Sequence, residues 1–340
     1  MTGWQAILTP EVLGLSGAGF AVVALGMGPL IQYLAGQGRM AQPNARSNHT
    51  TPKPEGGGLL VLATLIPIWF LLADRPMGHI LLPAAVLGVI SWLDDTRGLS
   101  PLVRFPAHIV AVCVALWFEP TFILPLEKFL PEPLAYAVIA FVWVWFINLF
   151  NFMDGIDGIT GTETVSIGVG VAMVVALHGF AADFGAIGIA TAAVACGFLI
   201  WNRPPSKVFL GDVGSVPLGF LLAWLLFSLA AAGPWIVAII LPAYYLADST
   251  LTLLDRMRRK QKIWQAHREH FYQRAAIGGF GHGGVVWRVL ACNIVLIVIS
   301  LFYDRLGVIA SWALAAVPVI VLLGALWQAG RRDVPPPPGA

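Results

Sequence analysis

The sequence is poor in charge: only 11% of its 340 residues are Asp, Glu, Lys or Arg, against about 25% in an ordinary soluble domain. It is also poor in cysteine. Cys113, Cys196 and Cys292 are far apart and lack the spacing of a metal site, so we expect each to be a small hydrophobic residue in the core. Hydrophobic residues make up 58% of the chain. This composition excludes an ordinary soluble domain and indicates a membrane protein.

The hydrophobic residues are gathered in runs that approach the length of about 20 residues needed to cross a bilayer. These runs cover residues 12–35, 57–73, 78–93, 103–118, 134–150, 160–177, 184–200, 216–233, 235–254, 285–303 and 308–328. They lack the alternation of a transmembrane barrel. We therefore predict an all-α integral membrane protein with about eleven transmembrane helices. The first run lacks the basic leader and cleavage pattern of a signal peptide, so we expect a retained helix.

We expect residues 1–330 to form a single polytopic domain, followed by a disordered, proline-rich cytoplasmic tail over 331–340. Basic residues set the orientation of such a domain. If the segment 36–56 is cytoplasmic, only Arg75, Lys128 and Arg305 of the 20 basic residues fall on the opposite side. We therefore predict an N-terminus outside and a C-terminus inside.

Polar residues outside the helices are concentrated in five loops on the predicted cytoplasmic side. The loops are 43–58, 94–98, 148–161, 201–215 and 255–274. This asymmetry favours one site that faces the cytoplasm and is assembled from all five loops. A transporter is the alternative, but it would carry ionisable residues deep in its spans. The only acidic residue that we place clearly within a span is Asp248, and it could line the same mouth.

Two adjacent acids, Asp94 and Asp95, end the third hydrophobic run. Carboxylates at a helix C-terminus oppose the helix dipole, and neighbouring acids repel each other, so this pair needs a compensating cation. In a purely structural interpretation Arg97 supplies it. In a functional interpretation the pair handles magnesium or phosphate, because hard divalent ions prefer carboxylate oxygens and keep substrate phosphates as further ligands.

The stretch "NLFNFMDGIDG" at 148–158 places two amides and two carboxylates where a hydrophobic run ends. Asp154 and Asp157 lie among glycines, which favours a tight loop that can approach a ligand. A polar turn would not need Asn148 and Asn151 as well. Asp212, flanked by glycines, would by itself be a turn or a helix cap. Together with the pair at 94–95, these carboxylates have few local basic partners and imply a bound cation.

The loop 255–274 is the most basic segment of the chain, which positive-inside anchoring partly explains. His267, His270 and Arg274 follow at spacings of three and four, so we expect them to share a helical face suited to a diphosphate. A zinc site is weakly supported, because no third ligand is indicated. Arg46 and His49, ahead of "PKPEGGG", are a further candidate wall of the site.

These stretches together resemble the polyprenyl-phosphate N-acetylhexosamine-1-phosphate transferases, or glycosyl transferase family 4, in matching order from about residue 40 to 275. The aspartate pair closes a span in that family. The pattern N-x-x-N-x-x-D-G-x-D-G matches residues 148–158, and F-x-G-D-x-G-S matches residues 209–215. The resemblance implies transfer of N-acetylhexosamine-1-phosphate from a UDP-sugar to undecaprenyl phosphate, with release of UMP. In chemical terms, a lipid phosphate oxygen attacks the β-phosphorus of the nucleotide-sugar.

The resemblance also implies roles for individual residues. Asp212 and Asp94 would bind Mg²⁺, for which Mn²⁺ could substitute, with the aspartate pair near the phosphates. Asp157, Asn202 and Phe209 would lie near uridine, with Phe209 stacked on the base. The catalytic candidates are Asp94, Asp95, Asp154, His267 and His270; the substrate-binding candidates are Asn148, Asn151, Asp157, Asn202, Phe209, Arg274, His49 and Arg46.

The sequence departs from the peptidoglycan translocase of this family at two places. The translocase has three consecutive histidines where this chain reads "HREHFYQR", which is similar to the branch that initiates O-antigen synthesis with N-acetylated, often 6-deoxy, hexosamines. Thr50 stands where the translocase has a lysine, so His49 or Arg46 would substitute.

A homodimer, the exact sugar and the identity of any general base stay open. A transporter of a nucleotide-sugar or lipid-linked substrate is the alternative function, whereas a prenyl synthase is disfavoured, because Asp94 and Asp95 lack the further acid of such sites.

Overall fold

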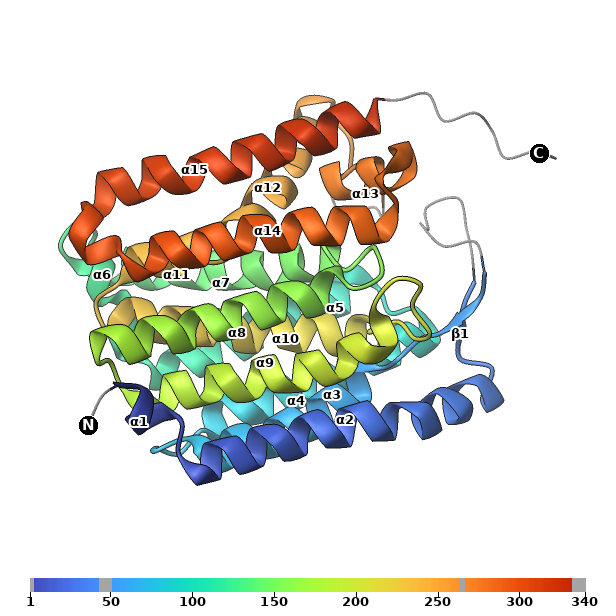
Figure 1. Cartoon of the computed structure of the whole chain (residues 1–340), viewed down its shortest axis with the longest axis horizontal. Coiled ribbons are helices and arrows are strands. Elements are labelled where there is room, and N and C mark those ends of the chain that lie inside the picture. The colour runs from blue at the N-terminus through green and yellow to red at the C-terminus, as the bar shows by residue number, and fades with distance from the viewer. Residues whose placement is uncertain (1–2, 43–50, 263–266, 332–340) are drawn as a thin grey trace.

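A computed structural model describes residues 3–42, 51–262 and 267–331, which form a bundle of long helices (Figure 1). The helices before the middle of the chain are α1 (Gly3–Ile7), α2 (Pro10–Gly36), α3 (Gly58–Leu72), α4 (Gly78–Arg97), α5 (Pro101–Phe118), η1 (Pro120–Ile123), α6 (Leu124–Glu127) and α7 (Glu132–Phe152). The later helices are α8 (Ile159–His178), α9 (Ala182–Asn202), α10 (Asp212–Ala231), α11 (Trp235–Ile240), α12 (Ala243–Arg258), α13 (Phe271–Ala275), η2 (Ala276–Phe280), α14 (Gly281–Leu301) and α15 (Tyr303–Gly330). The strands β1 (Met40–Ala41) and β2 (Lys53–Pro54) pair in an antiparallel ribbon.

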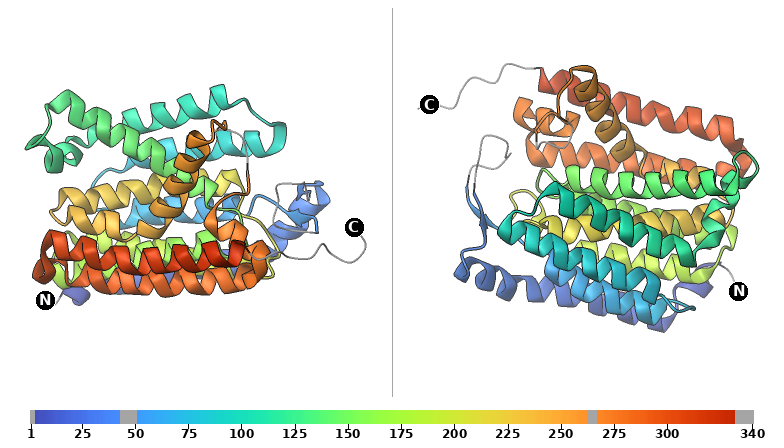
Figure 2. Two further views of the ribbon diagram at one scale, coloured as in Figure 1. Left: turned by 90° about the horizontal axis from the view of Figure 1, so that it is seen from above. Right: turned by 180° about the vertical axis from the view of Figure 1, so that it is seen from behind.

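The prediction of an all-α membrane protein is confirmed. Within the described residues, nine helical segments are long and apolar enough to cross a membrane, and α3 is a shorter apolar helix of 15 residues. The predicted span 235–254 is interrupted between α11 and α12, at Leu241 and Pro242. Proline cannot donate a backbone hydrogen bond and disfavours a continuous helix. As a result α12 runs obliquely to the long helices (Figure 2, left).

Helices α8 and α10 form the centre of the bundle. In the most hydrophobic stretches of α8 and α10, 83% and 89% of the residues are buried. In the corresponding stretch of α2 only 22% are buried. Helix α8 packs tightly on α9, because a Cβ atom added at Gly168 would lie 2.5 Å from the carbonyl oxygen of Gly188. Small residues permit such close approach between helices in membranes. On α10, the ring of Phe220 stacks on Trp143 of α7, with 5.1 Å between the ring centroids.

The outer helices expose large hydrophobic side chains, as expected of a surface that faces lipid. Trp117 and Ile309 are 83% and 85% exposed. Cys113 is also exposed, so the expectation of a core position is wrong for this residue, whereas Cys292 is buried. The predicted tail lies outside the described residues from position 332 onward.

The two ends of the bundle differ. The ribbon and α13 lie together at one end, where α15 also finishes, and α1 and α6 lie at the opposite end (Figure 1). The first end therefore collects the loops in which the sequence placed the candidate site.

Candidate functional site

A polar cavity of 200 Å³ lies at the end of the bundle that carries the ribbon and α13. It is lined by Ala41, Glu55, Asn151, Asp154, Gly155, Ile156, Asp157, Asn202, Phe209, Leu210, Gly211, Asp212, Gln273 and His282. Four of the five predicted loops contribute to this wall. The fifth, 94–98, reaches it through Asp95, which contacts the start of α10. Residues of all five loops therefore meet at or beside this one cavity.

Asp95 caps the N-terminus of α10. Its carboxylate accepts hydrogen bonds from the backbone N–H groups of Asp212, at 3.3 Å, and Val213, at 3.1 Å. These donors have no partner within their own helix, and the dipole of α10 favours a negative charge there. Gly211 permits the approach, because a Cβ atom added at this position would lie 2.9 Å from Asp95 Oδ2. The φ of Gly211 is +76°. The end of α4 is thus joined to the start of α10.

Asp94 is held by a different cation from the one considered in the sequence. Its Oδ2 lies 2.6 Å from Nη1 of Arg104, and its Oδ1 accepts a hydrogen bond from the backbone of Leu99. Arg97 is exposed and has no ion pair among the described residues, so the structural interpretation based on Arg97 is wrong. Arg104 also lies 3.6 Å from Asp212 Oδ2. A single guanidinium therefore stands between the two acids predicted as metal ligands.

Asp212 lies at the floor of the cavity beside Asn151. The Asn151 amide donates to Asp212 Oδ1 at 2.7 Å and to Ser215 Oγ at 2.9 Å. Around it, burial and then the charge of Asp212 raise the pKa of Glu55. Burial likewise raises the pKa of Asp154 to about 7. Glu55 was not among the sequence candidates, because nothing in "PKPEGGG" indicates which side of the loop faces the site.

The donor set fits a hard divalent cation that is shared with a substrate. Glu55, Asp95, Asp154 and Asp212 surround this region, and Arg104 is the cation paired with it. Among the described residues no three His, Cys, Asp or Glu side chains converge closely enough to hold a metal ion alone. Mg²⁺ usually takes one or two protein carboxylates and completes its shell with water and substrate phosphates. These residues offer such a partial set of carboxylate ligands.

A second polar cluster surrounds Asp157 at the cavity wall. Its carboxylate accepts hydrogen bonds from the Ser206 backbone N–H at 3.0 Å, from Ser206 Oγ at 2.7 Å and from Lys53 Nζ at 3.3 Å. Nδ1 of His282 lies 3.2 Å from Asp157 Oδ2. Although burial raises the pKa of Asp157, the hydrogen bonds from His282 and Ser206 hold it below its usual range. The carboxylate is therefore ionised and already well supplied with donors.

Asn202 and Phe209 lie at the same wall of the cavity. Asn202 accepts from the Gly158 backbone at 2.9 Å and donates to the Val208 carbonyl at 2.9 Å, so its amide joins two site loops. The ring of Phe209 lies under the ammonium of Lys53, 5.2 Å from the centroid. Asn202 thus shapes the wall, whereas Phe209 offers an aromatic surface.

The histidines of the basic loop do not share a helical face. Both residues precede α13, with His270 as its N-cap, although their rings stack with centroids 4.9 Å apart. His270 is buried and lies 3.2 Å from Asp248, which also accepts from the first two backbone N–H groups of α13. Burial, followed by the charge of His270, lowers the pKa of His267 to about 4. Asp248 therefore fastens α13 to α12.

The remaining candidates lie away from the cavity or outside the description. Arg274 is exposed, and its Cβ lies beside Gly330 at the end of α15, so it does not line the cavity. Arg46 and His49 fall outside the described residues. The acid expected to be alone within a span has a counterpart: Glu163 is buried in α8 and accepts a hydrogen bond from Asn293 of α14 at 2.7 Å.

An apolar groove of 680 Å³ adjoins the polar cavity. It is lined by Leu87, Ile90, Ser91, Pro101, Leu102, Arg104, Phe105, His108, Phe141, Val144, Trp145, Asn148, Asn151, Phe152, Asp212, Val216 and Leu253. Asn148 belongs to this groove rather than to the cavity, and its amide donates to the Val144 carbonyl at 2.7 Å. Asn151 and Asp212 line both hollows, so the groove and the cavity meet at these two residues.

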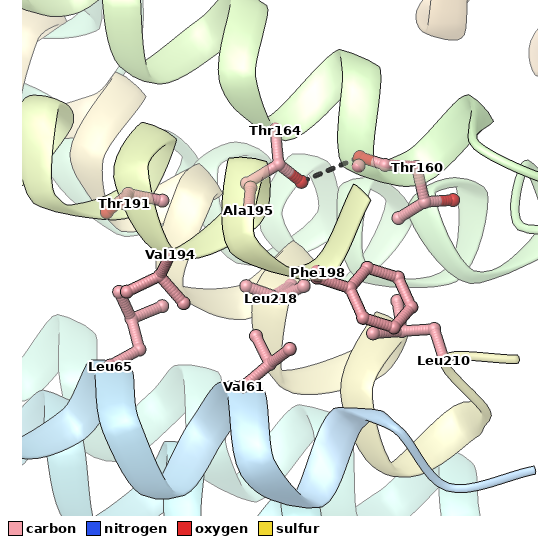
Figure 3. A pocket seen from close by; sticks show the side chains of 11 residues that line it. Val61, Leu65, Thr160, Thr164, Thr191, Val194, Ala195, Phe198, Leu210 and Leu218 are labelled. Carbon is pink, nitrogen blue, oxygen red and sulfur yellow. Dashed lines mark hydrogen bonds between the residues drawn. The ribbon is translucent and has the colours of Figure 1, made fainter. Parts of the chain in front are cut away.

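A third hollow lies in the core between α3, α8, α9 and α10 (Figure 3). Its volume is 10 Å³, and its walls are mostly apolar, with Val61, Leu65 and Leu218 opposite Thr160 and Thr164. A space of about this size holds at most one water molecule. It is a packing defect rather than a binding site.

Known proteins resemble this chain in the region that builds the site. Residues 77–230 match the model of glycosyl transferase family 4. A probable undecaprenyl-phosphate N-acetylglucosaminyl 1-phosphate transferase of Bacillus subtilis is 27% identical, over 75% of this chain and 74% of its own. A decaprenyl-phosphate N-acetylglucosaminephosphotransferase of Mycobacterium tuberculosis is 24% identical, over 95% and 89%.

A phospho-N-acetylmuramoyl-pentapeptide-transferase of Streptococcus pneumoniae is 26% identical, over 86% of this chain and 94% of its own. The relatives therefore include both hexosamine and muramoyl-pentapeptide enzymes, so they support the reaction class without distinguishing the branch. The matched region contains Asp94, Asp95, Asp154 and Asp212, which the fold brings to one end of the bundle. Over residues 77–230 this multi-pass membrane protein is therefore similar to glycosyl transferase family 4.

Proposed function

We propose that the protein transfers N-acetylhexosamine-1-phosphate from a UDP-sugar to undecaprenyl phosphate and releases UMP, at the cytoplasmic face of the bacterial inner membrane. The observation that carries the proposal is the meeting of the two hollows at Asn151 and Asp212. A polar cavity suits a nucleotide-sugar, and an apolar groove suits a prenyl chain. Their shared residues lie where a lipid phosphate would reach the donor diphosphate.

Arg104 is placed to bind the acceptor phosphate. It lines the apolar groove, and its guanidinium lies between Asp94 at 2.6 Å and Asp212 at 3.6 Å. Asp94 fixes the guanidinium, which can still offer further N–H donors to a phosphate. A prenyl chain in the groove would therefore present its phosphate to Arg104 at the junction with the cavity.

The chemistry requires charge neutralisation more than proton removal. A phosphate monoester is mostly ionised at neutral pH, since its second pKa is about 6, so attack by its oxygen needs little help from a base. Asp212, supported by Asn151, would hold Mg²⁺. Asp95 replaces Asp94 as the second proposed ligand, because Asp94 is paired with Arg104. When bound, the ion would neutralise charge on the reacting phosphates. Asp154, beside them, completes the acidic floor.

The donor would occupy the polar cavity with its base near Phe209. Phe209 offers an aromatic surface, and Asp157 and Asn202 hold the surrounding loops together. The "HREHFYQR" segment supports an N-acetylated hexosamine donor of O-antigen synthesis as the specific proposal. Its Gln273 lines the cavity, near the place where the sugar would lie.

Release of UMP in detergent, with undecaprenyl phosphate and a panel of UDP-N-acetylhexosamines, tests the reaction. Asp212→Asn should abolish release, whereas Asp304→Asn, at a half-exposed acid of α15, should not. Mg²⁺ should raise the melting temperature of the wild type but not of Asp212→Asn, because a ligand of the folded state stabilises it. Retained activity in Asp212→Asn would contradict the assignment. Uptake of labelled UDP-sugar into proteoliposomes without UMP would favour the transporter instead.

A further inference from the structure

Glu163 is a buried acid in the core of the bundle that lines neither the polar cavity nor the apolar groove. It lies in α8, about one turn after the helix begins at Ile159. Its Oε2 accepts a hydrogen bond from Nδ2 of Asn293, a buried residue of α14, at 2.7 Å. Helices α8 and α14 lie side by side (Figure 1), so this contact joins two long helices away from water.

No positive charge accompanies this carboxyl group. Among the described residues no lysine, arginine or histidine pairs with Glu163, and its surroundings are an apolar interior and the amide of Asn293. The titratable groups close enough to interact with it are Tyr245 of α12 and Cys292 of α14, and a buried phenol or thiol is neutral at neutral pH. An ionised carboxylate in a protein interior is very costly unless a cation pairs with it. Glu163 is therefore expected to be neutral.

Two buried oxygens of these side chains have no hydrogen-bond partner among the described residues. They are Oε1 of Glu163 and Oδ1 of Asn293, and each belongs to a group whose other polar atom already contacts the opposite group. A protonated carboxyl group has one O–H donor, and an amide oxygen is an acceptor. A proton on Oε1 would satisfy both oxygens, because a carboxylic acid and a primary amide can form a ring closed by two hydrogen bonds.

The position of α14 along α8 affects the wall of the polar cavity. His282 lies in the first turn of α14 and lines the cavity, and its Nδ1 is 3.2 Å from Oδ2 of Asp157. Asp157 lies in the loop that leads into α8. The contact between His282 and Asp157 therefore depends on how α14 packs on α8. The residues that line the apolar groove belong to other helices.

We propose that Glu163 binds a proton and forms with Asn293 a cyclic acid–amide pair, which fixes α14 on α8 and so positions His282 at the cavity wall. Glu163 is a positioning residue, since it acts through α14 and does not touch the cavity. The amide donates to Oε2 and the acid donates to Oδ1, so both buried groups are satisfied without a charge. The effect on donor binding rests on the proposed function, whereas the proton on Glu163 does not.

Infrared difference spectroscopy of the purified protein in detergent tests the proton directly, because the C=O stretch of a protonated carboxyl group is separate from the bands of ionised carboxylates. We expect a protonated-carboxyl band in the wild type that Glu163→Gln lacks, while protonated acids common to both proteins cancel. The melting temperature of Glu163→Gln should stay within about 2 °C of the wild type, because an amide at this position can form the same two hydrogen bonds with Asn293. The absence of a difference band would overturn the proposal.

Tyr245→Phe is the matched control. The Tyr245 hydroxyl is buried beside Glu163 and has no hydrogen-bond partner among the described residues. Its removal should leave both the band and the melting temperature unchanged. Loss of the band in Tyr245→Phe would show that the hydroxyl, rather than Asn293, holds the proton on Glu163, and would overturn the acid–amide pair.

Steady-state release of UMP tests the positioning. Glu163→Leu keeps the bulk of the side chain but removes both hydrogen bonds. We expect it to raise the KM for the UDP-sugar by about tenfold, because a small displacement of a binding wall is costly, and to leave the KM for undecaprenyl phosphate within about twofold. Glu163→Gln should restore both values to those of the wild type.

Three results would decide against the proposal. Equal rises of both KM values in Glu163→Leu would show a general loss of structure, and equal defects in the Leu and Gln variants would show that the pair needs a charge. A melting temperature that rises with NaCl in the wild type but not in Glu163→Gln would assign a bound sodium ion in place of the proton. If the wild type releases no UMP, the proposed function fails, and the infrared band still decides the protonation of Glu163.

Discussion

Helices α4 and α5 each connect two polar clusters, one at either end of the bundle. At the end away from the cavity, Glu119 is buried and its carboxylate pairs with Arg75 at 3.0 Å and His79 at 3.0 Å. It also accepts a hydrogen bond from the indole of Trp224 on α10 at 3.0 Å. One acid is thus matched by several donors, and the cluster joins the ends of α4 and α5 to α10.

At the cavity end of the bundle, carboxylates outnumber the positively charged groups that pair with them. Glu55, Asp95, Asp154 and Asp212 lie close enough for their charges to interact, while Arg104 is the cation paired with Asp212. A saturated cluster holds helices together, whereas an excess of carboxylates either takes up protons or attracts a ligand of positive charge. The comparison shows that the site is marked by its unmatched charge, since both ends are polar and partly buried.

The sharpest test of this difference replaces one arginine at each end of the bundle with methionine. Arg104 and Arg75 are similarly exposed, at 37% and 41% of the side chain, and each pairs with an acid whose side chain is no more than 9% exposed. We expect Arg104→Met to lower the rate of UMP release by about a hundredfold, the size expected when a charge-stabilising donor is lost. Arg75→Met should leave the rate within threefold. Steady-state assays with matched protein concentrations would measure both.

The reverse pattern would contradict the comparison. If Arg75→Met slowed the reaction as much as Arg104→Met while both proteins kept their melting temperatures, the outer cluster would belong to the functional machinery. Arg104→Lys gives a further control, since it keeps the charge but loses the planar fork. We expect an intermediate rate for this variant.

The sequence located the acids of the site better than their partners. Asp95, Asp154 and Asp212 stand out because carboxylates at helix ends and among glycines are unusual in so apolar a chain. Lys53 and Arg104 could not be chosen from the other basic residues, because their roles depend on which helices meet. In the same way, the spacing of His267 and His270 indicated a helical face, but α13 begins only at Phe271, where Asp248 accepts from its first backbone N–H groups.

The fold also has features that the sequence alone could not predict. Hydrophobic runs predicted the spans well, because length and composition alone decide whether a helix can cross a bilayer. The break at Pro242 within the predicted span 235–254 was not predicted, although it gives α12 its oblique course (Figure 2). That course brings Leu253 to the apolar groove, a feature that no local pattern in the sequence indicates.

A substitution in the apolar groove is expected to have a smaller effect. It distinguishes binding of the lipid from binding of the UDP-sugar. Val144 lines the groove, whereas Val142, two residues earlier on α7, is exposed and does not line it. We expect Val144→Phe to raise the KM for undecaprenyl phosphate by about tenfold, because one added ring in an apolar pocket changes binding by roughly 1–3 kcal/mol. The KM for the UDP-sugar should be unchanged, and Val142→Phe should change neither. Equal changes in both KM values would show that the groove does not hold the lipid.

The smallest expected effect tests whether the outer cluster is only structural. Glu119→Gln keeps the shape of the side chain and an oxygen that can accept from Trp224, but it removes the charge that faces Arg75 and His79. Arg75 is partly exposed and can be hydrated, so the loss should be about 1 kcal/mol, or a melting temperature lower by about 2–4 °C. The rate of UMP release should stay within twofold, because Asp95 and Arg104 remain joined to Asp212 at the far ends of α4 and α5. A tenfold slower reaction at an unchanged melting temperature would mean that the two ends are coupled, and the distinction between a matched cluster and an unmatched one would no longer separate support from function.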